Sequence, residues 1–242
     1  KVSLSYALAD NASVYASASQ GFRSGGFNIS APAYGPEEVN AFELGYKASL
    51  LDGRLNAEAA LYFSQYDDYI MFITDLSVSL ASFQANGGEA EIQGFEFATQ
   101  FQATESLSLG LSGNVTETEF VTVTSPVVHV GDPITASPKY SYTAHADYRF
   151  DWSADTAGFA YLSYSRQGSS SAISRTSYGE LESSDLGFVS ANLGAQWQDF
   201  TLTLSGKNLT NEQRSTSAVN ASRLGIDARR PRTLSLSASY QF

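Results

Sequence analysis

Tyrosine and arginine side chains recur in the polar segments between the hydrophobic stretches of this 242-residue sequence. Aromatic rings can stack on a flat ligand, and guanidinium groups can donate charge-assisted hydrogen bonds to an anion. Side chains of these two types are therefore suited to hold a flat, anionic chelate. The candidates are Tyr34, Tyr66, Tyr69, Arg166, Arg175, Tyr178, Arg214 and Arg223.

Patterns for catalysis or metal binding are missing from the sequence. His129 and His145 are the only histidines, and we interpret both as ordinary polar residues without nearby carboxylates rather than as metal ligands. There is no cysteine, which excludes a thiol nucleophile, a disulfide and a zinc–thiolate cluster. No G-x-S-x-G elbow is present, and the glycines at 21, 25 and 26 lack the following helix and Lys-Ser/Thr of a phosphate loop. We therefore expect no enzyme, no cofactor and no bound metal.

The elements that must position these side chains are strands, because hydrophobicity alternates with a period of two along most of the chain. The alternation predicts eleven strands, which lie near residues 2–8, 12–22, 42–50, 55–63, 95–101, 107–111, 140–150, 158–167, 189–197, 200–205 and 234–242. For the strand at 158–167 either face could be the apolar one. His145 lies between two outward alanines and is predicted to face inward.

The connections between these strands alternate in length. Short turns at 10–11, 52–53, 104–105, 151–156 and 198–199 alternate with long polar links at 23–38, 67–89, 118–138, 168–187 and 209–229. Outer-membrane barrels have short turns on the periplasmic side and long loops outside, whereas a soluble sandwich has no reason to segregate loop lengths. The last strand is then predicted to end at the periplasmic rim. Residues 69–83 are the place where an extra external hairpin is expected.

Composition and charge support a membrane barrel. Charged residues make up only 16% of the chain, while 14 Tyr and 15 Phe are present, which suits a wall with one face in lipid and aromatic girdles at the interfaces. No stretch approaches 18 consecutive apolar residues, so a transmembrane helix is excluded and a closed barrel is the remaining way to span a bilayer. The net charge of −11 argues against nucleic acid as a partner.

Five segments resemble the TonB-dependent outer-membrane receptors, in that family's order and over nearly the whole chain. They are QGFRSGGFN at 20–28, PE at 36–37 with FELGYK at 42–47 and DGR at 52–54, NGG at 86–88 with GFE at 94–96, NLTN at 208–211, and RPR at 230–232. The sequence departs from the family after NLTN, where a tyrosine is usual and Glu212-Gln213-Arg214 stands instead, which places that loop's conformation in doubt. The terminal Tyr240 and Phe242 are similar to the aromatic strand end that the barrel insertion machinery recognises.

This resemblance implies a 22-stranded transmembrane antiparallel up-and-down β-barrel, of which residues 1–242 supply the last eleven strands as a C-terminal portion. The N-terminal strands, the plug domain and the segment that engages TonB are not in this sequence, and neither is a signal peptide. The implied function is active transport across the bacterial outer membrane of a ferric siderophore or similarly scarce large nutrient. The implied partners are outer-membrane lipid and lipopolysaccharide, whose phosphates the loop arginines could bind instead of substrate.

Two alternatives from other classes stay open at this stage. An autotransporter translocator is also a barrel with a terminal aromatic, but it has about twelve strands and a helix inside the pore, and no helical stretch is visible here. A soluble β-rich adhesin or sandwich requires the outward aliphatic rows to be buried between two sheets. The sequence does not name the transported substrate.

Overall fold

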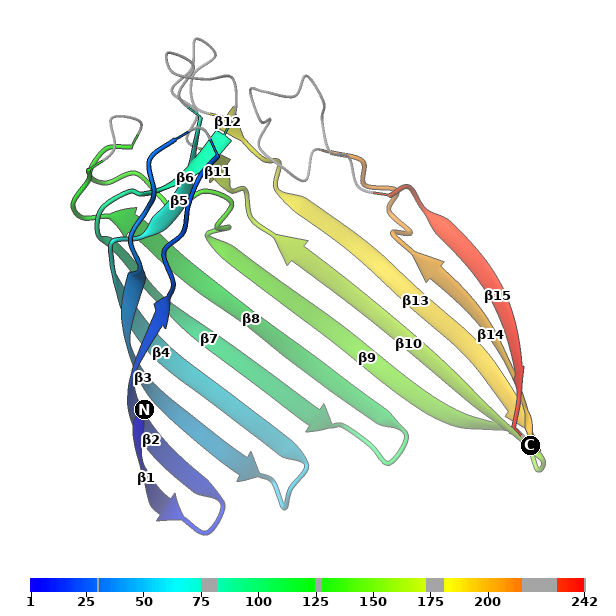
Figure 1. Ribbon diagram of the computed structural model, residues 1–242. Coiled ribbons are helices and arrows are strands. Elements are labelled where there is room, and N and C mark those ends of the chain that lie inside the picture. The colour runs from blue at the N-terminus through cyan, green and yellow to red at the C-terminus, as the bar shows by residue number, and fades with distance from the viewer. Residues whose placement is uncertain (30, 75–81, 125–127, 173–180, 215–229, 242) are drawn as a thin grey trace.

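A computed structural model describes the chain except for residues 30, 75–81, 125–127, 173–180, 215–229 and 242. The main sheet contains eleven antiparallel strands, which form an open arc with β1 at one end and β15 at the other (Figure 1). In spatial order they are β1 (Val2–Ala9), β2 (Ala12–Arg23), β3 (Glu37–Leu50), β4 (Leu55–Asp67), β7 (Ala90–Gln102), β8 (Leu107–Phe120), β9 (Tyr140–Ser153), β10 (Thr156–Gln167), β13 (Leu186–Trp197), β14 (Phe200–Lys207) and β15 (Thr233–Tyr240). The prediction of eleven strands is confirmed.

The strand register places the alternating hydrophobic residues of all eleven strands on one face. Leu44 on β3, for example, lies opposite Ala16 on β2 and Leu61 on β4. The register also settles the face of β10, because Leu162 lies between Ala146 and Ala191 on the same apolar side. Side chains on successive residues point to opposite faces of a strand, so Ser, Thr, Gly, Glu and Lys fill the other face.

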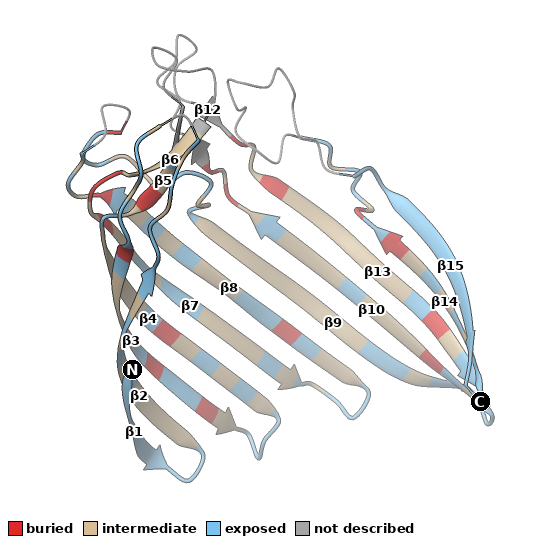
Figure 2. Cartoon of the chain, viewed as in Figure 1, coloured by how far each residue is buried: buried red, intermediate tan, exposed pale blue. Residues whose placement is uncertain are grey.

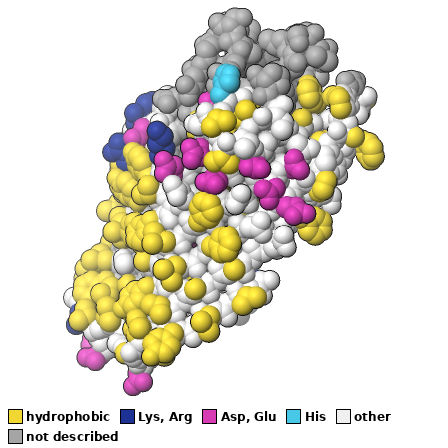
Figure 3. Space-filling model, turned by 90° about the vertical axis from the view of Figure 1, so that its left-hand side faces the viewer, with side chains coloured by type: hydrophobic (Ala, Val, Ile, Leu, Met, Phe, Trp, Pro, Cys, Tyr) yellow, Lys and Arg dark blue, Asp and Glu magenta, His cyan; other side chains and the backbone are white. Residues whose placement is uncertain are grey.

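The apolar face is exposed rather than covered by a second layer. Leu4 is 74% exposed and Leu44 57% exposed, and buried residues are scattered singly over the strands (Figure 2). Figure 3 shows hydrophobic side chains gathered in a broad field over the lower part of the molecule, with Asp and Glu side chains at mid-height. A soluble sandwich would bury these rows between two sheets, so the structure overturns that alternative.

An aromatic row marks the short-turn end of the apolar face. The rings of Trp197, Phe200 and Tyr240 lie in succession on β13, β14 and β15, with centroids 5.8 and 4.7 Å apart. Tyr148 and Phe150 on β9 stack in the same way at 5.4 Å. Aromatic belts of this kind lie at the membrane–water interface of barrels. Gln241 donates its backbone N–H to Asp199 O in the β13–β14 turn, so the chain ends at the predicted side.

The long connections lie at the opposite end of the sheet and carry two small hairpins. β5 (Ile70–Thr74) pairs with β6 (Ser82–Asn86), which confirms the extra hairpin expected at 69–83. A second pair, β11 (Ser171–Ala172) and β12 (Leu181–Glu182), was not predicted. A small hydrophobic cluster of Ala90, Phe120, Val128 and Ile134 joins the 121–138 segment to the tops of β7 and β8.

Several strands extend further toward the long-loop end than the hydrophobic alternation predicted. β3 begins at Glu37 rather than near 42, and β8 continues to Phe120 rather than ending near 111. These extensions carry polar residues on both faces, because they rise above the lipid and no longer need an apolar side. Periodicity therefore fails there, although the backbone pairing continues. Among the described residues, no helix is long and apolar enough to cross a membrane.

Candidate functional site: the polar face and its upper rim

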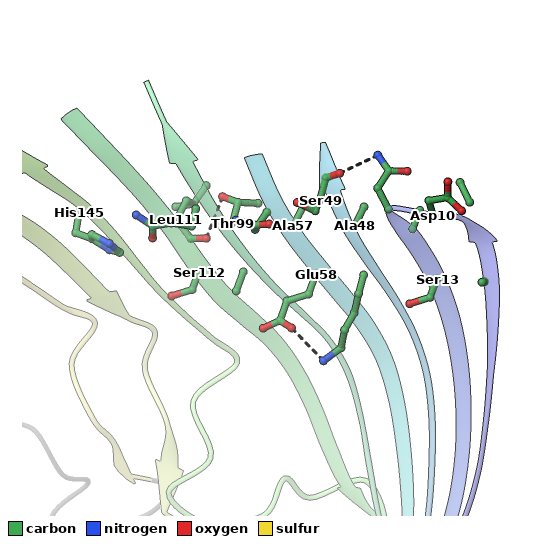
Figure 4. Close-up of a pocket in the computed structure, with 18 residues that line it drawn as sticks. Asp10, Ser13, Ala48, Ser49, Ala57, Glu58, Thr99, Leu111, Ser112 and His145 are labelled. Carbon is green, nitrogen blue, oxygen red and sulfur yellow. Dashed lines mark hydrogen bonds and ion pairs between the residues drawn. The ribbon is translucent and has the colours of Figure 1, made fainter. Parts of the chain in front are cut away.

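The polar face of the sheet is the face opposite the exposed hydrophobic rows, and we call it the luminal wall and the space in front of it the lumen. Near the middle of this wall, Tyr15 donates a hydrogen bond to Glu43, and Lys47 Nζ lies 3.4 Å from Glu58 Oε2. These side chains and Glu96 line a hollow of about 580 Å³. A second hollow of about 820 Å³ continues toward the short turns, where Asn11 donates to Ser49 O at 2.8 Å (Figure 4). This wall therefore carries polar and charged side chains at its middle.

His145 projects from β9 into this lumen, which confirms its predicted direction. Its ring lies over Gly110 on the neighbouring strand and its centroid is 5.9 Å from that of Tyr161. A Cβ atom at Gly110 would overlap the imidazole, so the glycine makes room for the ring. Phe159 covers Gly194 in the same way on β10 and β13. Among the described residues, no group of three or more His, Asp or Glu is placed to hold a metal ion.

His129 lies in the 121–138 segment at the long-loop end, as expected, but it does have a carboxylate neighbour. Its Nδ1 is 3.9 Å from Asp132 Oδ2, and its backbone N–H donates to the same oxygen at 2.6 Å. The expectation that no carboxylate stands near either histidine was therefore wrong for His129. The contact caps a local turn, and it does not assemble a metal site.

At the top of the lumen, an ion pair ties the β5–β6 hairpin to the wall. Arg23 at the end of β2 and Glu37 at the start of β3 are cross-strand partners on the luminal side. Arg23 Nη2 donates to Glu37 Oε2 at 2.9 Å and to Ile70 O at 2.6 Å. The Ile70 N–H donates to the same Glu37 oxygen at 2.6 Å. Both backbone groups of Ile70 are thus satisfied by the two side chains, as a neighbouring strand would do.

Tyr66 and Tyr69, which the sequence had selected, lie together beside this ion pair. Their rings meet edge to face with centroids 5.6 Å apart, and Tyr69 also meets Phe120 at 5.7 Å. Burial raises the pKa of Tyr69, and the Glu37 carboxylate raises it further, while Arg23 opposes this. Tyr69 is therefore a neutral hydroxyl at physiological pH. We call Arg23, Glu37, Tyr66 and Tyr69 the rim cluster.

Tyr34 lies on the loop between β2 and β3, next to the β5–β6 hairpin. Its hydroxyl donates to Gln84 Oε1 at 2.5 Å, and its backbone forms two hydrogen bonds with Gly26 at 3.0 Å. Asn28 reaches the same strand, because its Nδ2 donates to Gln84 O and its Oδ1 accepts from Gln84 N. The loop and the hairpin are therefore joined into one external unit that stands on the rim cluster.

Arg166 lies apart from this unit. Its register on β10 places it opposite Tyr142, on the same face as the outward tyrosines. It forms a two-pronged ion pair with Asp185, at 3.1 and 2.9 Å, and Tyr140 donates to the same carboxylate at 2.7 Å. These hydrogen bonds, from Arg166 first and Tyr140 second, hold the pKa of Asp185 below its ordinary value. The structure does not bring Arg166 together with Tyr34, Tyr66 and Tyr69.

The remaining candidates divide into those the structure describes and those it does not. Arg175, Tyr178 and Arg223, together with the terminal Phe242, lie outside the described residues. Arg214 pairs with Glu212, whose pKa falls to about 2 because the Arg214 guanidinium and backbone N–H donate to it. Tyr240 lies in the aromatic row against Phe200.

The NLTN segment at 208–211 fastens the base of the last long loop. Asn208 is only 5% exposed, and its Nδ2 donates to the carbonyl oxygens of Glu212 and Arg230, each at 2.9 Å. Its Oδ1 accepts from the Glu212 N–H at 2.9 Å. Asn211 Oδ1 accepts from the Arg232 N–H at 3.0 Å. The two asparagines thus join the chain on both sides of the loop, in spite of the unusual Glu212-Gln213-Arg214 that follows.

With the sheet, the lumen and the loops described, comparison with known proteins decides the family. Residues 1–209 match the family described as TonB dependent receptor-like, beta-barrel. The chain belongs to this family. It is therefore an outer-membrane β-barrel protein of a kind that serves as a transport receptor. The match also sets aside the autotransporter alternative.

Individual relatives are consistent with this assignment. The metal-pseudopaline receptor CntO of Pseudomonas aeruginosa is 28% identical over 156 residues, which are 62% of this chain and 20% of that receptor. The ferric yersiniabactin uptake receptor FyuA from Yersinia pestis superposes with a TM-score of 0.82 at 21% identity, over 99% of this chain and 36% of its own. The pyoverdine outer membrane receptor FpvA from Pseudomonas aeruginosa PAO1 gives 0.74 at 19% identity, over 99% and 35%. The chain thus spans about a third or less of these relatives.

Sequence reasoning had not assigned Arg23 and Glu37 to the site. Arg23 stood within the QGFRSGGFN segment and Glu37 within the PE pair, but each was used only as a mark of family resemblance. Their role depends on the β5–β6 hairpin folding back against the β2–β3 pair, which alternation within single strands does not reveal. The only sequence signal was the opposite charge at two strand ends flanking one loop.

Proposed function

We propose that this chain forms the C-terminal eleven strands of a 22-stranded outer-membrane receptor that binds and imports a scarce metal chelate. The chelate class is a ferric siderophore or a ligand of similar size and charge. The missing strands and a plug domain would complete the barrel, and TonB would supply the energy through that plug. The protein's own role is capture and passage, without covalent chemistry.

The rim cluster is the observation that carries this proposal. It combines the half-exposed guanidinium of Arg23 with the rings of Tyr66 and Tyr69 at the long-loop end of the luminal wall. Stacking surfaces together with a cation suit a planar, anionic chelate. Tyr34 lies on the loop that is hydrogen-bonded to the same β5–β6 hairpin. CntO, FyuA and FpvA are receptors for metal-pseudopaline, ferric yersiniabactin and pyoverdine, and this similarity favours the same substrate class.

The other candidates have separate places in the proposal. Arg175, Tyr178 and Arg223 belong to long links, and we propose that they also contact the chelate. Arg166 faces outward, and its position favours contact with lipopolysaccharide over contact with the chelate. Tyr240 and Phe242 are proposed as the aromatic strand end that the barrel insertion machinery recognises, because Tyr240 is the last residue of β15.

A binding measurement tests the proposal. The full-length gene product is purified in detergent and titrated with a panel of ferric chelates, using quenching of intrinsic fluorescence as the signal. The panel contains ferric citrate, a ferric tris-catecholate and a neutral ferric tris-hydroxamate. We expect saturable binding of at least one member and none of iron-free catechol. Absence of binding to every chelate would reject the proposed substrate class.

A further inference from the structure

Arg23 and its acidic partner Glu37 differ in how far they are exposed to solvent. Glu37 is only 7% exposed, and one of its oxygens accepts from both Arg23 and the Ile70 N–H. The Arg23 side chain, in contrast, is 52% exposed. Its two hydrogen bonds both come from Nη2, and its Nε and Nη1 donors have no partner within the described part of the chain. A guanidinium has five N–H donors, so three of them remain available.

The free side of Arg23 has two further donors beside it. The Tyr66 and Tyr69 hydroxyls take part in no hydrogen bond among the residues that the structure describes, although both rings are half-buried. The charge of Arg23 reaches both of them, and Tyr69 stays protonated. These donors therefore lie together in the rim cluster, where Tyr69 adjoins Ile70, the partner of Arg23, and the two tyrosine rings also pack against the hydrophobic cluster around Phe120. A carboxylate, phenolate or catecholate oxygen fits such a set of donors.

We infer that Arg23, with the Tyr66 and Tyr69 hydroxyls, binds an anionic oxygen group of the chelate and sets the receptor's preference for anionic over neutral chelates. This inference rests on the proposed function, and it adds the residue that distinguishes anionic from neutral ligands. Glu37 is a positioning residue: it holds the Nη2 edge of the guanidinium against Ile70, so that the remaining N–H groups point away from the wall. It does not touch the ligand.

A purely architectural role for the ion pair predicts different binding results from a role in recognising ligand charge. Two variants distinguish the two roles. If the pair only fastens the β5–β6 hairpin, Arg23→Gln removes the contacts of the guanidinium and should weaken binding of anionic and neutral chelates alike, whereas Glu37→Gln should change neither. If Arg23 binds the anionic group, Arg23→Gln should weaken binding of anionic chelates only. Glu37→Gln keeps an oxygen that accepts from Ile70 N and from Arg23, while it removes the neutralising charge. It should therefore bind anionic chelates as tightly as the natural protein or more tightly.

The experiment measures the affinity of the full-length gene product for ferric citrate, ferric tris-catecholate and a neutral ferric tris-hydroxamate. Loss of a hydrogen bond to a charged group is expected to weaken anionic binding about 10- to 100-fold in Arg23→Gln. The neutral chelate should change by no more than about twofold. Tyr69→Phe should give a smaller, about 3- to 10-fold, loss for anionic chelates only. Arg54→Gln, at the short turn between β3 and β4 and thus at the opposite end of the sheet, is the matched control and should change neither.

Each outcome of these measurements supports or overturns either the inference about Arg23 or the proposed function. Equal affinities of Arg23→Gln and the natural protein for anionic chelates overturn the inference and leave the proposed function standing. Equal losses for anionic and neutral chelates in Arg23→Gln show that the pair is only architectural and overturn the inference. Binding of the neutral chelate alone by the natural protein also overturns the inference. Failure of the natural protein to bind any chelate overturns the proposed function itself. Heat-modifiable gel mobility confirms that each variant has folded.

Discussion

Replacing Asn208 by aspartate should destabilise the protein through two specific atoms. The substitution keeps the size of the side chain and the oxygen that accepts from the Glu212 N–H. It removes the two N–H groups that now donate to the Glu212 and Arg230 carbonyls, each at 2.9 Å. Both carbonyls are only part-buried, so each lost hydrogen bond is expected to cost about 0.5–1.5 kcal/mol and the two together about 1–3 kcal/mol.

The loss should depend on pH with a definite sign. A carboxylate facing two carbonyl oxygens disfavours its charged form, so the folded-state pKa of the introduced aspartate lies above its unfolded value. Protonation restores one donor. The variant is therefore expected to approach the stability of the natural protein in acid and to lose stability as the pH rises through the folded-state pKa.

Urea unfolding in detergent micelles, followed by gel mobility without boiling, measures this effect on the full-length gene product. Asn211→Asp is the matched control, because within the described residues the Asn211 side chain only accepts hydrogen bonds, from Arg232 and Gln213, and aspartate retains the accepting oxygen. We expect the control to stay within about 1 kcal/mol of the natural protein. An Asn208→Asp variant as stable as the natural protein at pH 8, or two variants with equal losses, would refute the reasoning.

Three further predictions concern two positions in the sheet and one in the last long link. Leu44→Arg places a charge on the lipid face and should cost about 2–4 kcal/mol in urea unfolding, whereas Ser17→Arg on the luminal face should cost under about 1 kcal/mol; equal costs would contradict the assignment of faces. Gly194→Ala drives a methyl group into the ring that covers it and should cost about 1–3 kcal/mol in the same assay, so an unchanged midpoint would count against that contact. The Arg214 backbone amide, which donates to Glu212, should be protected from hydrogen exchange at pH 4.5 and should lose that protection as the pH falls toward about 2. The reason is that the lowered pKa of Glu212 keeps its carboxylate charged, and the contact intact, above that range. Complete loss of protection already at pH 4.5 would contradict this prediction.

The wall of the barrel was predictable because one physical constraint acts on every strand. Lipid on one side and water on the other require an apolar residue at every second position, and this gave eleven strands with their connections in the correct order. The face of β10 was the exception, since Phe159 and Tyr161 on one side compete with Leu162 and Tyr164 on the other. Only the register with Ala146 and its neighbours decides which row meets lipid.

The site was less predictable because its contacts join segments that are distant in the sequence. Tyr66 and Tyr69 could be selected from residue type, and the structure brings them together. Arg166 was selected by the same reasoning, yet its partner is Asp185, and its strand position turns it outward. Arg23 escaped selection because its neighbour in space, Ile70, lies 47 residues away in sequence. Residue type predicted the chemistry, but long-range pairing determines which arginine supplies it.

Energised uptake is the measurement that tests the central claim most directly. The full-length gene product is expressed in a Gram-negative host that lacks its own receptors for ferric chelates, and accumulation of radioactive iron from each chelate is followed with and without TonB. The account predicts accumulation of an anionic chelate that requires both the receptor and TonB, and that falls in Arg23→Gln. Accumulation that is independent of TonB, or none from any chelate, would contradict it.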